Sequence, residues 1–371
     1  MASKDTATSL RQLLTQKKPP IHCLSKVGKN STNSLWPDFR EVEIWEDFTL
    51  KNLNESYGHV LDEDVSNFEL VMPQPQKLED TVTVQDKDVR NLIGWHDDLM
   101  QIAVQVAKRR LGLRIGHSLT YRYSTADASF LAHLPTASCQ TLVDHVIGLD
   151  DPLDPVLVVG FGRTVQKWNC PRLVAQLRNL PRGKQTGQLV WPLRQLANTC
   201  QKAGTRYGYI QTEEALVVCC FSSNGPGLWK AAIMPVPWTG HGVQVLTTEL
   251  ALWWLCMLAM APDHGHRVVR EEHMTRINEW DVVYLDQERG CMRRHRYSHV
   301  MMPAEASWLD PESSAMGNTN SLNVAHASSL AFAHNPHDPM TTLGDPNNPH
   351  SLDSDFFSDI FAEEFTEGYA G

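Results

Sequence analysis

The stretch VLVVGFG, residues 156–162, constrains the fold of this chain more than any other segment. Its residues are apolar at consecutive positions, so both faces of a strand would be buried, as in the centre of a sheet that helices cover on both sides. Further strand candidates lie at residues 117–123, 141–149, 206–212, 214–221 and 229–238. The sequence therefore predicts a multi-stranded sheet with residues 156–162 in its interior.

Three helices are expected around these strands. Apolar residues recur at helical spacing in residues 91–112 and 189–204, and each of these stretches ends in glycine. Residues 247–262 hold the longest apolar run, which is about half of the ~20 residues that a membrane span requires. We expect a buried helix there and no membrane segment. The order of helix, three strands, helix, three strands, helix predicts a mixed α/β sandwich.

Charge is distributed unevenly along the chain, and this defines the expected domains. No Lys or Arg follows Arg296, whereas eleven acids do. Residues 304–371 are rich in Ser, Asn, His and Pro without periodicity, which predicts a disordered acidic tail. Residues 1–89 also lack sustained periodicity, so we expect an irregular acidic N-terminal region. One α/β domain is expected between them, over residues 90–303.

The cysteines indicate a reduced environment. The chain has eight, and none of them forms a CxxC pair. The N-terminus has no apolar signal segment either. These features favour an intracellular protein, in the nucleus or the cytoplasm.

The turn after residues 156–162 does not match a phosphate-binding loop. GFGR lacks the third glycine of GxGxxG and the GK[ST] ending of a P-loop. A metal-dependent nuclease is the better interpretation. Such an enzyme needs carboxylates on adjacent strands to hold Mg²⁺ and a cation beside the attacked phosphate. Asp144 is expected in the middle of the strand 141–149, and Arg163 follows the next strand.

Several short motifs then occur in one order: WHDDLMQIAV, LVDHVIGL, VLVVGFGRTVQKW, RQLANTC and TRYGYIQTEEALVVCCF. Over about residues 90–260 the chain resembles the PD-(D/E)XK nuclease-like domains of filamentous fungi. The resemblance implies a restriction-endonuclease-like mixed sheet flanked by helices. It matches Val143–Asp144 to the first motif, residues 160–163 to Gly-(Asp/Glu)-x-Lys and Gln195 to a helical glutamine. Asp144, Arg163 and Gln195 would then be the catalytic positions, with Asp144 as the Mg²⁺ ligand.

Two departures from the family pattern bear on activity. Phe161 stands where the second carboxylate belongs, and its ring cannot coordinate a hard cation through oxygen. Arg163 replaces the lysine, and its planar fork does not act as a point charge. A catalytically degenerate homologue without a cofactor is therefore expected. The alternative is an active Mg²⁺-dependent endonuclease that recruits Asp97, Asp98 or Asp154.

A basic block suggests binding to DNA or RNA. Nine basic residues and no acid lie between Arg163 and Arg206. Phosphate contacts from Lys167, Arg172 and Arg206, with a base stacked on Trp168, would suit such a partner. The alternative is a solvated polar loop and helix face.

The end of the chain offers a third hypothesis. Residues 351–366 place aromatic and apolar side chains among acids, in the stretch SLDSDFFSDIFAEEFT. Acidic segments of this kind bind grooves of partner proteins as induced amphipathic helices. A regulatory adaptor that acts through this segment is therefore a further alternative, with the folded domain serving as scaffold.

Overall fold

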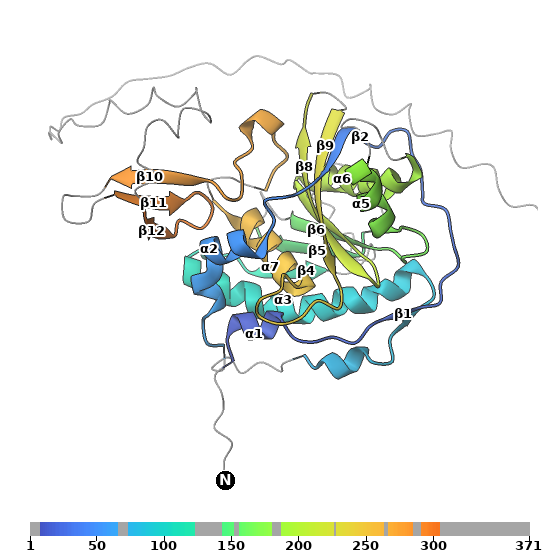
Figure 1. Cartoon of the computed structure of the whole chain (residues 1–371), viewed down its shortest axis with the longest axis horizontal. Coiled ribbons are helices and arrows are strands. Elements are labelled where there is room, and N and C mark those ends of the chain that lie inside the picture. The colour runs from blue at the N-terminus through green and yellow to red at the C-terminus, as the bar shows by residue number, and fades with distance from the viewer. Residues whose placement is uncertain are drawn as a thin grey trace, which may run out of the picture. The chain divides into compact units, whose positions relative to one another are not determined.

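A seven-stranded mixed sheet runs through the computed structural model of the chain, in the order β2–β9–β8–β7–β6–β5–β4 (Figure 1). Its strands are β2 (Asp38–Ile44), β4 (Leu119–Arg122), β5 (His145–Leu149), β6 (Val156–Gly162), β7 (Tyr207–Gln211), β8 (Ala215–Ser223) and β9 (Leu228–Pro237). Neighbouring strands are antiparallel except for two parallel pairs, β6 with β7 and β2 with β9. The predicted interior strand is β6, which is buried at every position.

The structure describes residues 8–65, 73–122, 143–151, 156–179, 187–225, 228–262, 266–284 and 291–304. The chain divides into two units, residues 1–309 and 310–371. All of the described residues belong to the first unit. The predicted acidic tail, including residues 351–366, lies outside the described residues from position 305 onward, and so does Asp154.

Helices cover both faces of the sheet. They are α1 (Leu10–Leu14), α2 (Leu50–Leu61), α3 (Arg90–Leu111), α5 (Cys170–Asn179), α6 (Trp191–Ala203) and α7 (Thr248–Met260). One cluster of buried apolar residues joins α1, α2, α3 and α7 to one face, and a second cluster joins α5 and α6 to the other. The mixed α/β architecture agrees with the prediction, and α5 is a further helix that the predicted order between residues 90 and 262 did not contain.

Helix α7 is the most deeply buried element of the structure. All of its thirteen residues are buried, as its apolar sequence predicts. The hydroxyl of Thr247 accepts a hydrogen bond from the Leu250 N–H and so caps the first turn. The helix lies on the same face of the sheet as α3, where it provides much of the larger apolar cluster.

The N-terminal region contains more regular structure than its sequence pattern indicated. Residues 1–89 were expected to be irregular, yet α1, α2 and the edge strand β2 lie within them. Leu53, Tyr57 and Val60 of α2 pack into the larger cluster. The sequence pattern did not indicate this strand because β2 pairs with β9, which lies far away in the sequence. The large sheet therefore extends beyond the expected boundary at residue 89.

Two small sheets complete the fold. β1 (His22–Cys23) pairs in parallel with β3 (Val82–Thr83), and β10 (Trp280–Tyr284), β11 (Cys291–His295) and β12 (Met301–Pro303) form an antiparallel meander. Among the residues that the structure describes, no helix combines the length and the apolar character needed to cross a membrane.

Candidate functional site

Asp144 lies immediately before β5, not in the middle of a strand as expected, and its side chain is almost fully buried. Its backbone N–H donates to the Gly160 carbonyl, which ties the residue to β6. Each carboxylate oxygen has a donor. Arg90 Nε donates to Oδ1 at 2.8 Å, and the Gly162 N–H donates to Oδ2 at 2.8 Å. Both oxygens that a metal would require are therefore engaged by the protein itself.

Arg163 and Gln195 are in direct contact. Arg163 Nη2 donates to Gln195 Oε1 at 2.8 Å, and Nη1 donates to the Gly162 carbonyl at 2.6 Å. The guanidinium carbon lies 5.2 Å from the ring centroid of Phe161. Arg163 directly follows Gly162, the last residue of β6, whose N–H group binds Asp144. The contact between Arg163 and Gln195 therefore lies next to Asp144 along the chain.

Phe161 occupies a core position. Its ring is fully buried in the apolar cluster beneath α5 and α6. An acid at this place would lose its hydration in an apolar environment, which carries a large free-energy cost for a charged group. The replacement of the expected carboxylate by phenylalanine therefore agrees with the local packing.

The glycines of β6 permit close approach by neighbouring groups. A Cβ atom on Gly162 would lie 3.0 Å from Val89 Cβ and 3.2 Å from the Asp86 carbonyl oxygen. A Cβ atom on Gly160 would lie 2.2 Å from Cζ of Tyr209. The two glycines of GFG thus provide room for the segment before α3 and for the ring of Tyr209.

The residues around Asp144 do not suit Mg²⁺. A hard divalent cation takes several oxygen ligands, whereas Asp144 shares its oxygens with a guanidinium and a backbone N–H. Among the described residues, no three His, Cys, Asp or Glu side chains gather in a way that could hold a metal ion. Of the acids considered as replacements, Asp98 is exposed on α3 and Asp97 is buried.

Asp97 belongs to a different buried group. Its Oδ1 lies 3.5 Å from His145 Nε2, and His145 Nδ1 shares a hydrogen bond of 2.6 Å with the Tyr209 hydroxyl. Burial lowers the pKa of His145, against the opposing effect of Asp97, so the imidazole is neutral at pH 7. His145 and Tyr209 are fully buried. The three side chains link α3 to β5 and β7 inside the protein, where a substrate does not reach.

Comparison with protein families, curated proteins and solved structures finds no match to this chain. The site is therefore judged on its own geometry.

The predicted nucleic-acid contacts separate into buried and exposed residues. Trp168 is fully buried and its Nε1 donates to the Leu189 carbonyl at 2.9 Å, so its ring has no face for a base. Arg206 is 1 % exposed, and its Nη2 lies 3.3 Å from the Tyr297 hydroxyl. Both residues are core residues in this structure, which corrects their assignment as binding residues.

Lys167 and Arg172 have different surroundings. Lys167 Nζ forms an ion pair of 2.7 Å with Asp86, which also accepts from the Thr164 N–H. Part of the Lys167 side chain remains in solvent. Arg172 is exposed in the first turn of α5, and Arg178 is exposed near the end of the same helix. The basic block therefore presents fewer cations to solvent than its composition suggested.

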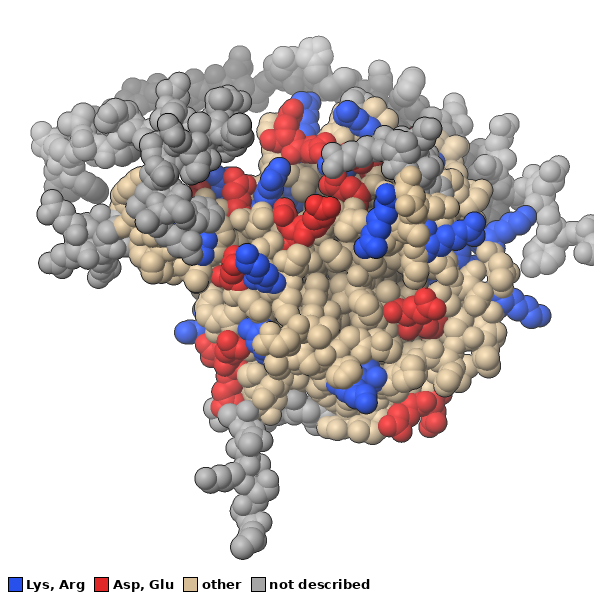
Figure 2. Space-filling model, viewed as in Figure 1, with Lys and Arg blue, Asp and Glu red and all other residues tan. Residues whose placement is uncertain are grey.

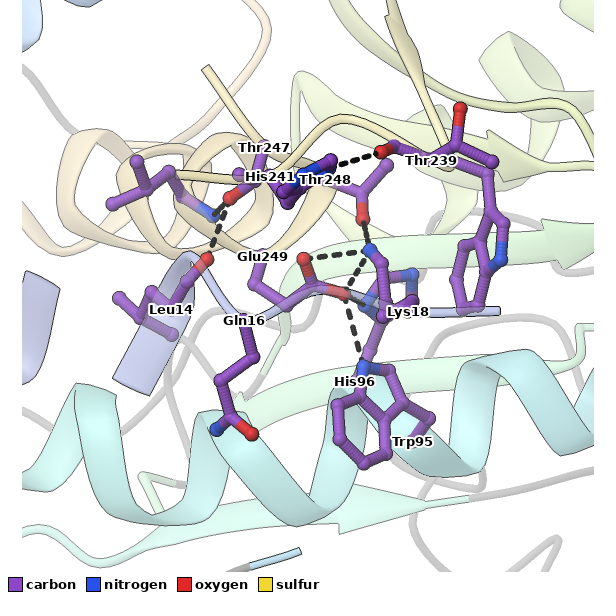
Figure 3. Close-up of polar contacts among 12 residues, drawn as sticks. Leu14, Gln16, Lys18, Trp95, His96, Thr239, His241, Thr247, Thr248 and Glu249 are labelled. Atoms are coloured by element: carbon purple, nitrogen blue, oxygen red, sulfur yellow. Dashed lines mark hydrogen bonds and ion pairs between the residues drawn. The ribbon is translucent and has the colours of Figure 1, made fainter. Parts of the chain in front are cut away.

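Lys18 and Glu249 form a buried ion pair that the sequence analysis did not predict, and Figure 3 shows it. Lys18 Nζ lies 2.5 Å and 2.7 Å from the two carboxylate oxygens of Glu249 at the start of α7, and it also donates to Thr248. Trp95 Nε1 donates to Glu249 Oε1 at 3.0 Å, and His96 Nδ1 lies 3.4 Å from the same oxygen.

Electrostatics keep this carboxylate charged. Burial alone would raise the pKa of Glu249, but Lys18 and His96 outweigh it and hold the pKa well below its ordinary value. The Lys18 ammonium also lies 4.1 Å from the ring centroid of Trp238. Both charged side chains are buried. The ion pair connects the N-terminal segment to α7, and Trp95 and His96 connect it to α3.

Proposed function

We propose that this protein is a catalytically inactive, nuclease-like α/β protein that acts by binding. The observation that carries the proposal is the state of Asp144, whose two oxygens are bonded to Arg90 and to the Gly162 N–H. Phe161 supports it, because the position of the second metal carboxylate in the family pattern is filled by a buried ring. The expected restriction-endonuclease-like topology remains part of the proposal, supported by the order of α3, three strands, α6 and a parallel strand.

A cleavage assay on the purified full-length chain tests the absence of activity. Single-stranded DNA, duplex DNA and RNA are incubated with Mg²⁺ or Mn²⁺, and the products are separated by electrophoresis. We expect no metal-dependent cleavage, because no second carboxylate stands with Asp144 to share a cation. Cleavage that Asp144→Ala abolishes and Asp98→Ala preserves would refute the proposal, since Asp98 is an exposed acid on α3.

Nucleic acid is the partner class that the exposed basic residues of α5 favour. Phosphate contacts by Arg172, Arg178 and Lys167 would give a salt-dependent affinity with a slope of about 0.9 per contact on a log–log plot. We expect the double variant Arg172→Ala/Arg178→Ala to flatten that slope by about two contacts in fluorescence anisotropy. Lys51→Ala is the matched control, because Lys51 is an exposed cation on α2. Equal slopes of affinity against salt concentration for the parent and the double variant would refute binding of nucleic acid by α5.

A further inference from the structure

In the part of the chain that the structure describes, no strand pairs with the outer edge of β2 at Val42 and Ile44. Among the described residues, β2 is the terminal strand of the large sheet and pairs with β9 alone. The Trp45 N–H donates to the Ile233 carbonyl of β9. Backbone groups alternate in direction along a strand, so Glu43 also faces β9, whereas the N–H groups of Val42 and Ile44 point away from the sheet. An unpaired edge of this kind is a template for another strand.

A cleft adjoins β2 and extends over the neighbouring face of the sheet, where Tyr207 of β7, Cys220 and Ser222 of β8 and Lys230 and Ala232 of β9 also line it. It has a volume of about 590 Å³, and residues 39–47 form one side along the whole length of β2. Leu177 and Arg178 of α5 form a wall on one face of the sheet, and residues 274–277 form a wall on the other. An extended chain placed beside β2 would direct its alternate side chains to the two faces of the sheet, toward α5 on one face and toward residues 274–277 on the other.

The two sides of the cleft differ in chemistry. Val42 and Ile44 pack against the apolar cluster beneath α5, on the side of Leu177. On the opposite face, Glu41 and Glu43 converge on Lys230 Nζ at 3.6 Å and 3.0 Å. Alternation along β2 thus gives one apolar side and one charged side.

The charged side has a surplus of acid around Lys230. Glu271 also reaches Lys230 Nζ, at 2.6 Å, so three carboxylates surround one ammonium. Around the whole cleft, five acids and four bases line the wall. Figure 2 shows these charges of both signs crowded around a hollow near the ends of β8 and β9. Arg40 also acts on Glu271, so the surplus is one negative charge, which complements a basic side chain from a partner.

We propose that the edge of β2 binds an extended peptide with alternating basic and apolar residues, which adds to the sheet as a further strand. The backbone of the peptide pairs with the outward N–H and C=O groups of Val42 and with the N–H of Ile44. Its basic side chains lie over Glu41 and Glu43, and its apolar side chains lie over Val42 and Leu177. The inference goes beyond the proposed function, because four strands separate β2 from β5, the strand that follows Asp144. Peptide binding at β2 does not depend on whether Asp144 is catalytic.

Fluorescence anisotropy with a labelled peptide of alternating lysine and valine tests the proposal. The peptide has seven residues, the length of β2. We expect saturable binding to the full-length chain, and no binding of the matched peptide of alternating glutamate and valine. Methylation of alternate backbone nitrogens of the lysine–valine peptide should abolish binding, because it removes the donors that pair with β2 without altering the protein.

Val42→Pro is the decisive variant. It removes an outward N–H that has no bond to β9, and proline is tolerated at such edge positions. We expect its affinity for the peptide to fall by about tenfold or more, which corresponds to one lost backbone hydrogen bond. Val42→Thr, which keeps the shape of the side chain and the N–H, should bind like the parent.

Several outcomes would overturn the inference. They are failure of the parent to bind the lysine–valine peptide, equal binding of the glutamate–valine or N-methylated peptide, and equal binding by a folded Val42→Pro variant. A parent that sediments as a dimer and becomes monomeric on Val42→Pro would show that a second copy occupies the edge instead. None of these readouts depends on nuclease activity or on nucleic-acid binding, so failure here is distinct from failure of the proposed function.

Discussion

Lys18→Met should destabilise the protein far more than an ordinary lysine substitution. Lys18 Nζ is bonded to both oxygens of Glu249 and to Thr248, and its side chain is fully buried. Methionine keeps most of the aliphatic stem, so the lost apolar burial is small. What remains is a buried carboxylate, 3 % exposed, that has lost its cation. Removal of one partner of a buried ion pair costs about 3–5 kcal/mol, a large part of the total stability of a typical domain.

The assay is urea unfolding at pH 7, followed by tryptophan fluorescence. Trp95 and Trp238 contact the pair directly and report on it. Lys17→Met is the matched control, because Lys17 is exposed and adjacent in sequence, so it should change the free energy of unfolding by less than about 0.5 kcal/mol. Equal midpoints for Lys18→Met and Lys17→Met would refute the reasoning. Adding Glu249→Gln to Lys18→Met should restore part of the lost stability, since it removes the stranded charge.

The same pair predicts a dependence on pH. The pKa of Glu249 lies below its ordinary value of 4.5 in the folded protein, so the unfolded chain takes up a proton more readily. Its contribution to stability is therefore complete above about pH 4.5 and is lost as the pH falls through the lower, folded-state pKa. In Lys18→Met, burial without the lysine raises the pKa of Glu249, so the variant regains stability as the pH falls through that raised pKa. We therefore expect the difference in free energy of unfolding between the parent and Lys18→Met to shrink as the pH falls, and to shrink further below pH 4.5.

Two further predictions concern packing. Gly160→Ala places a Cβ atom 2.2 Å from the Tyr209 ring and should cost about 1–3 kcal/mol through overpacking. Gly94→Ala, in the interior of α3 with nothing within 4 Å of the new atom, should instead stabilise by up to about 1 kcal/mol; urea unfolding of the two variants checks both signs. Trp168→Ala should lower the free energy of unfolding by about 3–5 kcal/mol, because the ring is fully buried. A urea midpoint close to that of the parent would show that the Trp168 ring is not a core side chain.

Most of the elements between residues 90 and 262 could be predicted because local patterns determine them, whereas helix α5 lies in a stretch that was predicted as polar loop. The apolar run of β6 and the continuous apolar surface of α7 each identify a buried element without knowledge of its neighbours. The N-terminal elements depend on distant partners instead. Nothing local distinguishes Lys18 from Lys17, and only Glu249, 231 residues further on, makes one of them a core residue.

The resemblance assigned the residues of the candidate site without their contacts. It matched Asp144, Arg163 and Gln195 to motifs in order along the chain, and the structure joins the last two directly. The motif order did not predict the contact between Arg90 and Asp144, because no sequence pattern distinguishes a basic residue at the start of a helix. For Arg206, composition favoured the surface because arginine is usually exposed, whereas its tertiary contact with Tyr297 places it in the core.

The attachment of the first residues to α7 has a consequence for synthesis on the ribosome. Lys18 emerges early, but Glu249 follows 231 residues later. At about 5–20 residues per second, the N-terminal segment waits roughly 10 to 50 s for its partner. β2 likewise stays unpaired until β9 has been made. The nascent chain therefore carries an incomplete sheet and an unneutralised lysine while the residues between these partners are made.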